Sequence, residues 1–282
     1  MNVLNYTFKS TLEFFQMAEA LASDEQKRER GGEWTGGLSF KKAMDLPKVG
    51  WNPEKLAAGT NKLLLRGKKT KISLKKDVRG GVLLVDNYST GNPMAFKRKV
   101  RSKSESKRLT LLVNMAESGS ISAESIFNKA MATATLVEEL RRQNVSVAVY
   151  GYYAAESTRN KLGLIEMVPV KTFSERLQLH KLGAVLHPAS LRQAYIGRVC
   201  NKGVFPNNVL SSYDEHPMGG GSGRISQMLE VQAVDLLKKE LREDNLMVIP
   251  SVQSYKNNLV TEADVEQYVN EIVDIANTTI SL

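Results

Sequence analysis

The sequence predicts an α/β protein whose core is a mainly parallel sheet, preceded by a small helical segment and a basic β element. An apolar run at residues 109–113 is followed by a long amphipathic stretch and a second apolar run at residues 145–150. This strand–helix–strand order implies a right-handed crossover between two parallel strands. The chain has 282 residues, of which 42% are apolar, and that content is sufficient for a buried core.

The first of three parts, residues 1–65, is expected to consist of short amphipathic helices. Its first helix is indicated by apolar residues at near-helical spacing, namely Leu12, Phe15, Met17, Ala18 and Leu21. Ser39 is expected to cap a short helix that Pro47 ends. Asn52 followed by Pro53 favours the start of another helix, because proline suits the first helical position.

The second part, residues 66–108, is expected to form a basic β element. Residues 61–110 carry fifteen Lys and Arg against three Asp and Glu, a local charge of +12, whereas the remaining residues sum to −3. Cations alternate with other residues at 69–75 and again at 97–103, a period of two that is typical of strands. The apolar run at 82–85 predicts a more buried strand.

The third part, residues 109–282, is expected to be the α/β core. Ser122 is predicted to cap a long helix that runs to about Gln143. Thr261 and Asp264 predict the start of a terminal helix. Further strands are predicted at 165–170 and 246–250, and further helices at about 176–182, 191–199 and 225–242.

Composition argues against several classes of protein. No apolar run approaches the roughly 20 residues that cross a bilayer, and the amino terminus lacks the pattern of a signal peptide. The single cysteine, Cys200, cannot form an internal disulfide, which suits a reducing cytoplasm. His180, His187 and His216 show no metal-ligand spacing, so we expect no metal and no cofactor.

The sequence also argues against an enzyme. Glu138 and Glu139 stand beside two arginines on a predicted helix, which is typical of a solvated face. The acidic residues Asp214 and Glu215 precede His216 without an identifiable partner. Ser118 lacks the flanking glycines of a nucleophile elbow, so no acid–base pair or nucleophile can be assigned.

The basic element predicts a track that binds the phosphates of nucleic acid. Its candidate contacts are Arg66, Lys68, Lys69, Lys71, Lys75, Lys76, Tyr88, Lys97, Arg98, Lys99, Arg101, Lys103, Lys107 and Arg108. Tyr88 is the candidate for stacking on a base. The alternative is a solvated edge that prevents aggregation between sheets, for which lysine is commonly used.

A glycine-rich stretch at 218–224 adds a candidate phosphate contact through Gly221, Ser222 and Arg224, because backbone amides at a helix start can cradle phosphate. It lacks the Lys-Ser or Lys-Thr of a Walker loop. A flexible surface loop is the competing interpretation, and the sequence favours it.

The run from Leu109 to Glu124, with the strand at 145–150, resembles the opening of a von Willebrand factor A-like domain. Such domains begin with a strand, an Asp-x-Ser-x-Ser metal loop, a long helix and a second strand. The resemblance implies a Rossmann-like core and a candidate metal site at Ser118 and Ser120. Here Asn114 replaces the expected Asp, and the serines follow about two residues late.

A broader resemblance is to a family of uncharacterised proteins encoded mainly by bacteriophages. It is carried by the segments Gly32–Ala43, Gly50–Trp51 and Leu186–Arg192. It implies a viral protein of the host cytoplasm that serves replication or transcription. We therefore expect a non-enzymatic protein that holds nucleic acid, preferably single-stranded DNA, and recruits a phage RNA polymerase or replication protein. The alternative is a protein-interaction adaptor, of the von Willebrand A-like kind, for an ATPase or an acidic host protein.

Overall fold

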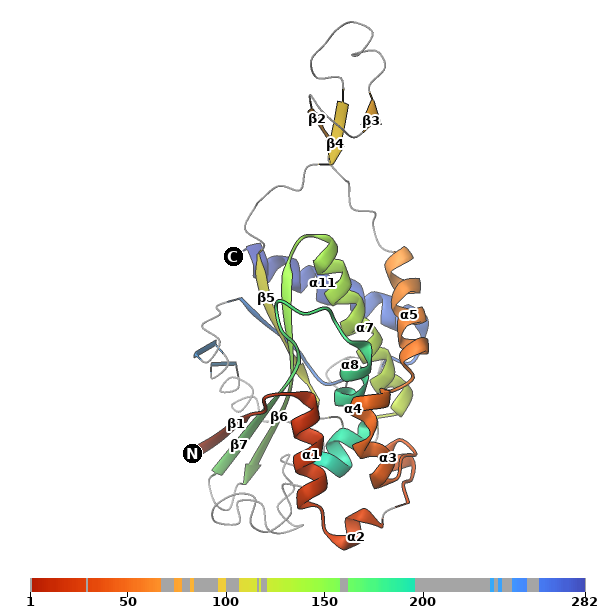
Figure 1. The fold of residues 1–282 in the computed structure, drawn as a ribbon, viewed down its shortest axis with the longest axis vertical. Helices are drawn as coiled ribbons and strands as arrows, with labels where there is room; N and C mark the ends of the chain where they lie inside the picture. The colour runs from red at the N-terminus through yellow and green to blue at the C-terminus, as the bar shows by residue number, and fades with distance from the viewer. Residues whose placement is uncertain are drawn as a thin grey trace, which may run out of the picture.

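The chain forms a mixed α/β structure with two sheets. The computed structural model describes residues 2–28, 30–66, 74–77, 82–83, 96–99, 107–115, 117, 121–157, 162–195, 234–235, 238–239, 245–252 and 259–281. A five-stranded sheet forms the centre, and a separate three-stranded sheet carries basic residues. Figure 1 shows the smaller sheet standing apart from the larger one.

The five-stranded sheet has the order β1-β7-β6-β5-β8. Its strands are β1 (Asn2–Thr7), β5 (Arg108–Asn114), β6 (Ser146–Ser157), β7 (Leu162–Lys171) and β8 (Leu246–Ile249). The pairs β1/β7, β5/β6 and β5/β8 are parallel, and β6/β7 is antiparallel. The sheet is therefore mostly parallel, as the sequence predicts.

The predicted strand–helix–strand unit is present as β5, α7 (Ala123–Arg142) and β6. The hydroxyl of Ser122 accepts a hydrogen bond from the main-chain N–H of Ser125 at 3.1 Å, so Ser122 is the predicted N-cap. Leu109 of β5 lies beside Val147 of β6 in the parallel register. This unit forms the centre of the sheet.

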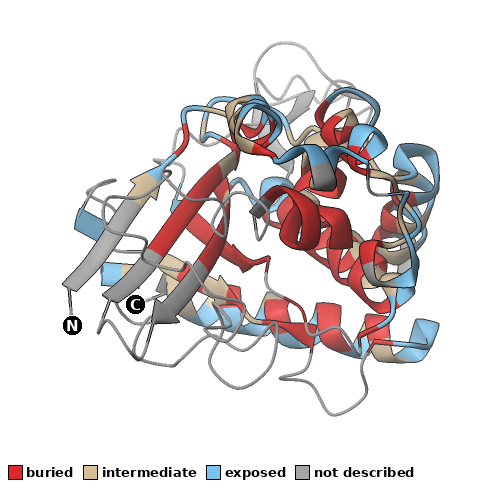
Figure 2. Cartoon of the chain, turned by 90° about the horizontal axis from the view of Figure 1, so that it is seen from below, coloured by how far each residue is buried: buried red, intermediate tan, exposed pale blue. Residues whose placement is uncertain are grey.

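One face of the sheet is covered by helices. They are α1 (Thr11–Leu21), α3 (Phe40–Met44), α4 (Leu46–Val49), α5 (Pro53–Arg66), α8 (Leu179–Leu186) and α11 (Glu262–Ser281), together with α7. Figure 2 shows the buried residues concentrated between the strands and these helices. Two short elements, α2 (Asp24–Lys27) and η1 (Glu33–Thr35), lie in the connections.

Both faces of β5 are apolar, because successive side chains of a strand point to opposite sides. Leu109, Leu111 and Val113 belong to the main core beneath the helices. Leu112 belongs to a smaller cluster on the other face. That second cluster also contains Tyr152, Ile165 and Met167. Burial of β5 on both faces is typical of a parallel strand in the interior of an α/β sheet.

The amino terminus differs from the expected helical segment. Residues Asn2–Thr7 form β1, an edge strand of the main sheet, with Asn2 opposite Leu162 and Thr7 opposite Met167. The strand continues with a hydrogen bond from the N–H of Phe8 to the carbonyl of Met167. The segment is a strand because it pairs with β7. Six residues are too few for their hydrophobic pattern to predict a strand from the sequence alone.

Pro47 was expected to end a helix, but it lies in the first turn of α4 instead. At that position the missing N–H of proline needs no partner. The predicted helices near 176–182 and 191–199 correspond to α8 and to the π-helix η2 (Ser190–Tyr195). Most of the helix predicted at 225–242 lies outside the described residues.

The three-stranded sheet lies within the predicted basic β element. It contains β2 (Leu74–Asp77), β3 (Val82–Leu83) and β4 (Phe96–Lys99) in the antiparallel order β2-β4-β3. Among the described residues, no helix has the length and hydropathy needed to cross a membrane.

The packing of β6 against α8 tests this fold. A Cβ on Gly151 would lie 2.6 Å from Cγ1 of Val185 and 2.2 Å from Sδ of Met115. Because the added methyl overpacks the core, Gly151→Ala should lower the free energy of unfolding by about 1–3 kcal/mol in urea denaturation. Gly32→Ala is the matched control, since its Cβ would meet no atom within 4 Å. Equal stability of the two variants would contradict the packing.

Candidate functional site

The carboxyl ends of β5 and β8 meet at the place where α/β folds most often bind ligands. From β5 the chain crosses to β6 on one side and later returns to β8 on the other, so the edge between β5 and β8 is a topological switch point. Glu117 follows β5, and Val252 follows β8. The residues at this edge are therefore the first candidate for a ligand-binding site.

A buried ion pair occupies the edge. The Nζ of Lys129, on α7, donates to a carboxylate oxygen of Glu117 at 2.7 Å and to the carbonyl of Asn114 at 2.6 Å. The same carboxylate accepts the N–H of Val252 at 2.9 and 3.1 Å. Side-chain exposure is 1% for Lys129 and 4% for Glu117. One pair thus connects β5, α7 and the segment after β8.

The electrostatics of Glu117 follow from this burial. Removal from water raises the pKa of its carboxyl, while the ammonium of Lys129 and the N–H of Val252 act in the opposite direction. Arg192, itself buried, also favours the carboxylate. The carboxylate of Glu117 is thus bonded to Lys129 and to the N–H of Val252. The counter-ion of this carboxylate is the ammonium of Lys129.

A second group of buried residues adjoins the cluster. His187 is 2% exposed, and its Nδ1 accepts the N–H of Ala189 at 3.0 Å. An accepting Nδ1 places the proton of the neutral imidazole on Nε2. Burial, followed by the positive charge of Arg192, lowers the pKa of His187 to about 4. The imidazole is therefore neutral at pH 7 and serves as a packing and hydrogen-bonding group.

The three segments that carry the resemblance to a phage-encoded family meet at His187. The rings of Trp51 and His187 lie 4.6 Å apart between centroids. Gly36 has φ +66, and a Cβ there would lie 2.9 Å from Cε1 of His187. Gln193, just beyond the third segment, donates to the carbonyl of Leu38 at 3.0 Å. These contacts join the segments within the helical layer. The residues that carry the resemblance therefore have a structural role in packing.

The metal site implied by the resemblance to von Willebrand A-like domains would lie in the loop after β5. Ser118 and Ser120 lie outside the described residues, while Asn114 gives its carbonyl to Lys129. Within the described ranges, no group of three or more His, Cys, Asp and Glu residues is placed to hold a metal ion. The acidic pair predicted to be a solvated face does form surface ion pairs, Glu138 with Arg141 at 2.8 Å and Glu139 with Arg142 at 3.8 Å.

The small sheet is the second candidate, and its register brings predicted contacts together. Lys75 stands directly opposite Arg98, and Lys76 stands directly opposite Lys97. Lys99 stands opposite Leu74. Cations thus occupy opposed positions on adjacent strands, an arrangement that destabilises a strand pair unless negative charge is supplied.

Other predicted contacts lie at the junction with the core. Arg66 ends α5. The Nζ of Lys107 donates to the carbonyl of Ile280, near the end of α11, at 3.2 Å. The guanidinium of Arg108 lies 5.2 Å from the ring centroid of Phe173. Lys107 and Arg108 thus have internal contacts in addition to any role in binding.

The remaining predicted residues lie outside the described part of the chain. They are Lys68, Lys69, Lys71, Tyr88, Arg101 and Lys103 of the basic element, and Gly221, Ser222 and Arg224 of the glycine-rich stretch. Their roles stay predictions.

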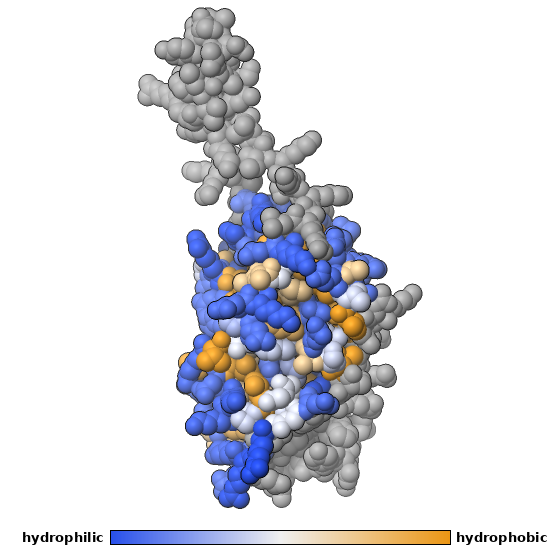
Figure 3. Space-filling model, turned by 90° about the vertical axis from the view of Figure 1, so that its right-hand side faces the viewer, coloured by the Kyte–Doolittle hydropathy of each residue, from blue (hydrophilic) through white to orange (hydrophobic). Residues whose placement is uncertain are grey.

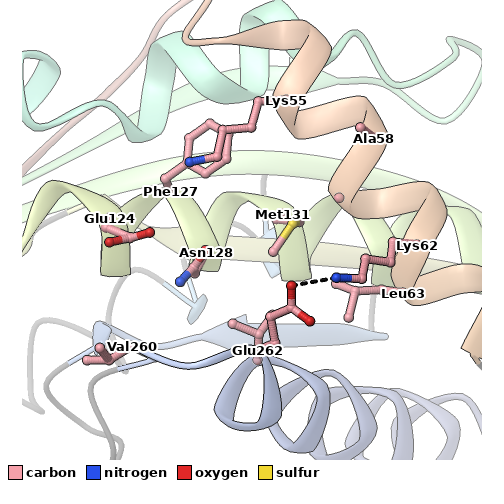
Figure 4. Close-up of a pocket in the computed structure, with 12 residues that line it drawn as sticks. Lys55, Ala58, Lys62, Leu63, Glu124, Phe127, Asn128, Met131, Val260 and Glu262 are labelled. Atoms are coloured by element: carbon pink, nitrogen blue, oxygen red, sulfur yellow. Dashed lines mark hydrogen bonds and ion pairs between the residues drawn. The ribbon is translucent and has the colours of Figure 1, made fainter.

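A pocket of about 330 Å³ lies between α5, α7 and α11. Figure 4 shows Phe127 and Met131 of α7 beside α5, with Lys62 and Glu262 joined by an ion pair. Lys55 lies over the Phe127 ring, 5.1 Å from its centroid. Two lysines and two glutamates line the pocket, so their charges balance. Figure 3 shows small, separate apolar patches on a largely hydrophilic face.

Comparison with known proteins places the chain in a family. A family model described as "Domain of unknown function (DUF7192)" matches residues 1–274. The chain belongs to this family. The match spans both the small basic sheet and the five-stranded sheet, so the DUF7192 domain includes both. No curated protein and no solved structure matches the chain.

The buried pair of Lys129 and Glu117 is not among the predicted site residues, although the sequence contains a signal for Lys129. Lys129 lies on the inner face of α7 between Ile126 and Thr133, where apolar residues dominate. A lysine within an apolar helical stripe indicates a buried partner. The identity of that partner, Glu117, depends on the loop after β5 and cannot be deduced from the spacing on α7.

We expect the pair to control stability. Lys129→Met and Glu117→Gln should each lower the free energy of unfolding by about 3–5 kcal/mol, because each leaves one buried charge without its partner. The double variant should lose less than the sum of the two losses. Urea denaturation of the four proteins measures this coupling. Additive losses would show that the two groups act independently.

His187 should make stability depend on pH. Its folded pKa of about 4 lies below the ordinary 6.5, so the unfolded chain binds more protons between these values. Stability should fall as pH decreases from 6.5 to 4, by about 3 kcal/mol in total. His187→Asn keeps an acceptor for Ala189 and should remove this component.

Urea denaturation across the same pH range checks the effect as a difference between wild type and variant. Glu117 affects stability with the opposite sign, because its raised pKa favours the folded state at lower pH. Taking the difference cancels its contribution. Identical pH profiles for the two proteins would refute the assignment to His187.

Proposed function

We propose that the chain is a non-enzymatic nucleic-acid-binding protein that holds single-stranded DNA on its small basic sheet. The observation that carries this proposal is the register of that sheet, in which Lys75 opposes Arg98 and Lys76 opposes Lys97. Like charges at directly opposed positions cost roughly 0.2–1 kcal/mol for each pair. Phosphate groups between and beside them remove that cost.

The spacing of a strand suits this ligand. Alternate residues on a strand, such as Lys97 and Lys99 of β4, lie about 6.5–7 Å apart, close to the separation of successive phosphates in an extended single strand. Contacts of this kind supply affinity and position the strand without selecting a base sequence. We therefore expect the affinity for DNA to fall strongly with salt concentration and to vary little with the base sequence.

The chemistry of the described core supports a binding role over catalysis. The carboxylate of Glu117 is directed at Lys129 and Val252, and the imidazole of His187 is neutral and buried. We infer that the core is a von Willebrand A-like scaffold for the basic sheet. In the phage setting, it recruits an RNA polymerase or a replication protein to the bound strand.

The test is fluorescence anisotropy with labelled single-stranded and duplex DNA across a salt series. Wild type should prefer the single strand. Replacing Lys75, Lys76, Lys97 and Arg98 by Gln should weaken binding roughly a hundredfold. The log–log salt slope should become shallower by about 0.7 for each phosphate that the variant no longer neutralises.

The matched control removes four exposed lysines from the helical layer, Lys27, Lys41, Lys42 and Lys48. It changes the net charge by the same amount and should bind nearly as well as wild type. Equal weakening in both variants would reduce the effect to net charge. Absence of DNA binding by wild type at low salt would overturn the proposal and direct attention to an acidic protein partner.

A further inference from the structure

A pocket of about 200 Å³ lies at the end of the core from which the chain leads into the basic sheet. Its walls come from the end of α7, the start of β6 and the turn after β7. Its floor is apolar, and its ionisable lining residues are Arg141, Lys171, Glu175 and Arg176. Three cations against one carboxylate give the pocket a positive charge.

Lys171 is the unusual member of this group. It is 6% exposed, and its Nζ donates to the main-chain carbonyls of Val147 and Thr172. Among the described residues, no carboxylate lies within ion-pair distance of it. Glu175 and Glu138 act on it only at longer range, and burial lowers its pKa. A buried ammonium without a close counter-ion is costly, and a bound anion offsets that cost.

The carboxylate of the pocket is already engaged. Glu175 accepts the N–H and the hydroxyl of Thr172, each at 2.9 Å, and these bonds lower its pKa. Both bonds go to its Oε2, which thus belongs to the local turn. Arg176 is exposed and forms no ion pair with a described residue. Arg141 pairs with Glu138 at an exposed site, where such a pair contributes little and is readily exchanged.

The pocket lies near the described residues at which the core leads into the basic sheet. Ser146 lines it and lies opposite Arg108 in the register of β5 and β6. Phe173, also in the lining, carries the guanidinium of Arg108 over its ring. Arg142 donates to the carbonyl of Leu64, in the last turn of α5, at 3.4 Å. Figure 1 shows the end of α5 and the start of β5 at this same end of the core.

We propose that this pocket binds one phosphate of the single-stranded nucleic acid that the basic sheet holds, with Arg141 and Arg176 as its exposed contacts. The inference rests on the proposed function and extends it from the small sheet to the core. The pocket lies at the end of the core where the described residues that lead to the sheet, the end of α5 and the start of β5, are found. Guanidinium groups suit this role, because they donate two parallel hydrogen bonds to phosphate oxygens.

The test compares Arg141→Gln/Arg176→Gln with the control Lys41→Gln/Lys42→Gln. Both variants remove two exposed positive charges, and the control lies on α3 at the other end of the core (Figure 1). With a labelled oligothymidylate, the arginine variant should bind at least about tenfold more weakly. Its salt slope should be shallower by about 0.7, the value for a single phosphate. The control should match wild type.

Three outcomes would overturn the inference. Binding by the arginine variant that equals wild type would exclude a contact in the pocket. Equal weakening in both variants would assign the effect to net charge. The third measurement is thermal unfolding in the presence of inorganic phosphate. If phosphate raises the unfolding temperature of wild type, but the arginine variant still binds oligothymidylate like wild type, the pocket is a site for the free anion alone.

These failures are distinct from failure of the proposed function. If wild type binds DNA and the basic-sheet variant does not, while the arginine variant still does, only the pocket is excluded. Unchanged thermal unfolding of the arginine variant verifies that the fold is intact, because both side chains lie on the surface.

Discussion

The ion pair between Lys129 and Glu117 is the constraint on which the core depends. A charge at 1% exposure is tolerated only with a close and well-bonded partner. Lys129 meets this requirement by reaching from α7 to the end of β5, and Glu117 meets it by accepting the N–H after β8. The pair therefore fixes the position of the long helix relative to the parallel strands β5 and β8. It also occupies the edge of the sheet at which this class of fold most often binds ligands.

The two ends of the core differ in how closely their buried charges are paired. At the carboxyl edge, the carboxylate of Glu117 bonds to Lys129 and is also stabilised by Arg192, beside a neutral histidine. The opposite end of the core contains Lys171 without a close counter-ion, and it leads to the basic sheet. In a chain with a net charge of +9, this end of the core brings the cations of the pocket near the described residues that lead to the basic sheet. Under the proposed function, a nucleic-acid strand bound there would contact two parts of the chain, the basic sheet and the pocket.

The helical layer has a different organising centre. Gly36 and Trp51, from the first part of the chain, both approach the buried His187, which lies far later in the chain. The close approach at Gly36 leaves no room for a side chain, and its positive φ favours glycine. The segments that carry the resemblance to a phage-encoded family are thus explained by packing. These positions therefore report on the packing of the fold, and they carry no information about a bound partner.

Local sequence determined the elements whose pattern is long and strongly periodic. The strand at 109–113, the helix capped by Ser122 and the terminal helix are where the periodicity places them, because capping and amphipathic spacing act within a few residues. The concentration of cations in residues 61–110 is likewise a property of the chain itself. Tertiary structure alone decided that Asn2–Thr7 forms an edge strand, since its partner β7 lies about 160 residues later. It also decided the partner of Lys129 and the grouping of Arg141, Lys171 and Arg176, because these depend on contacts between distant segments, which no local period encodes.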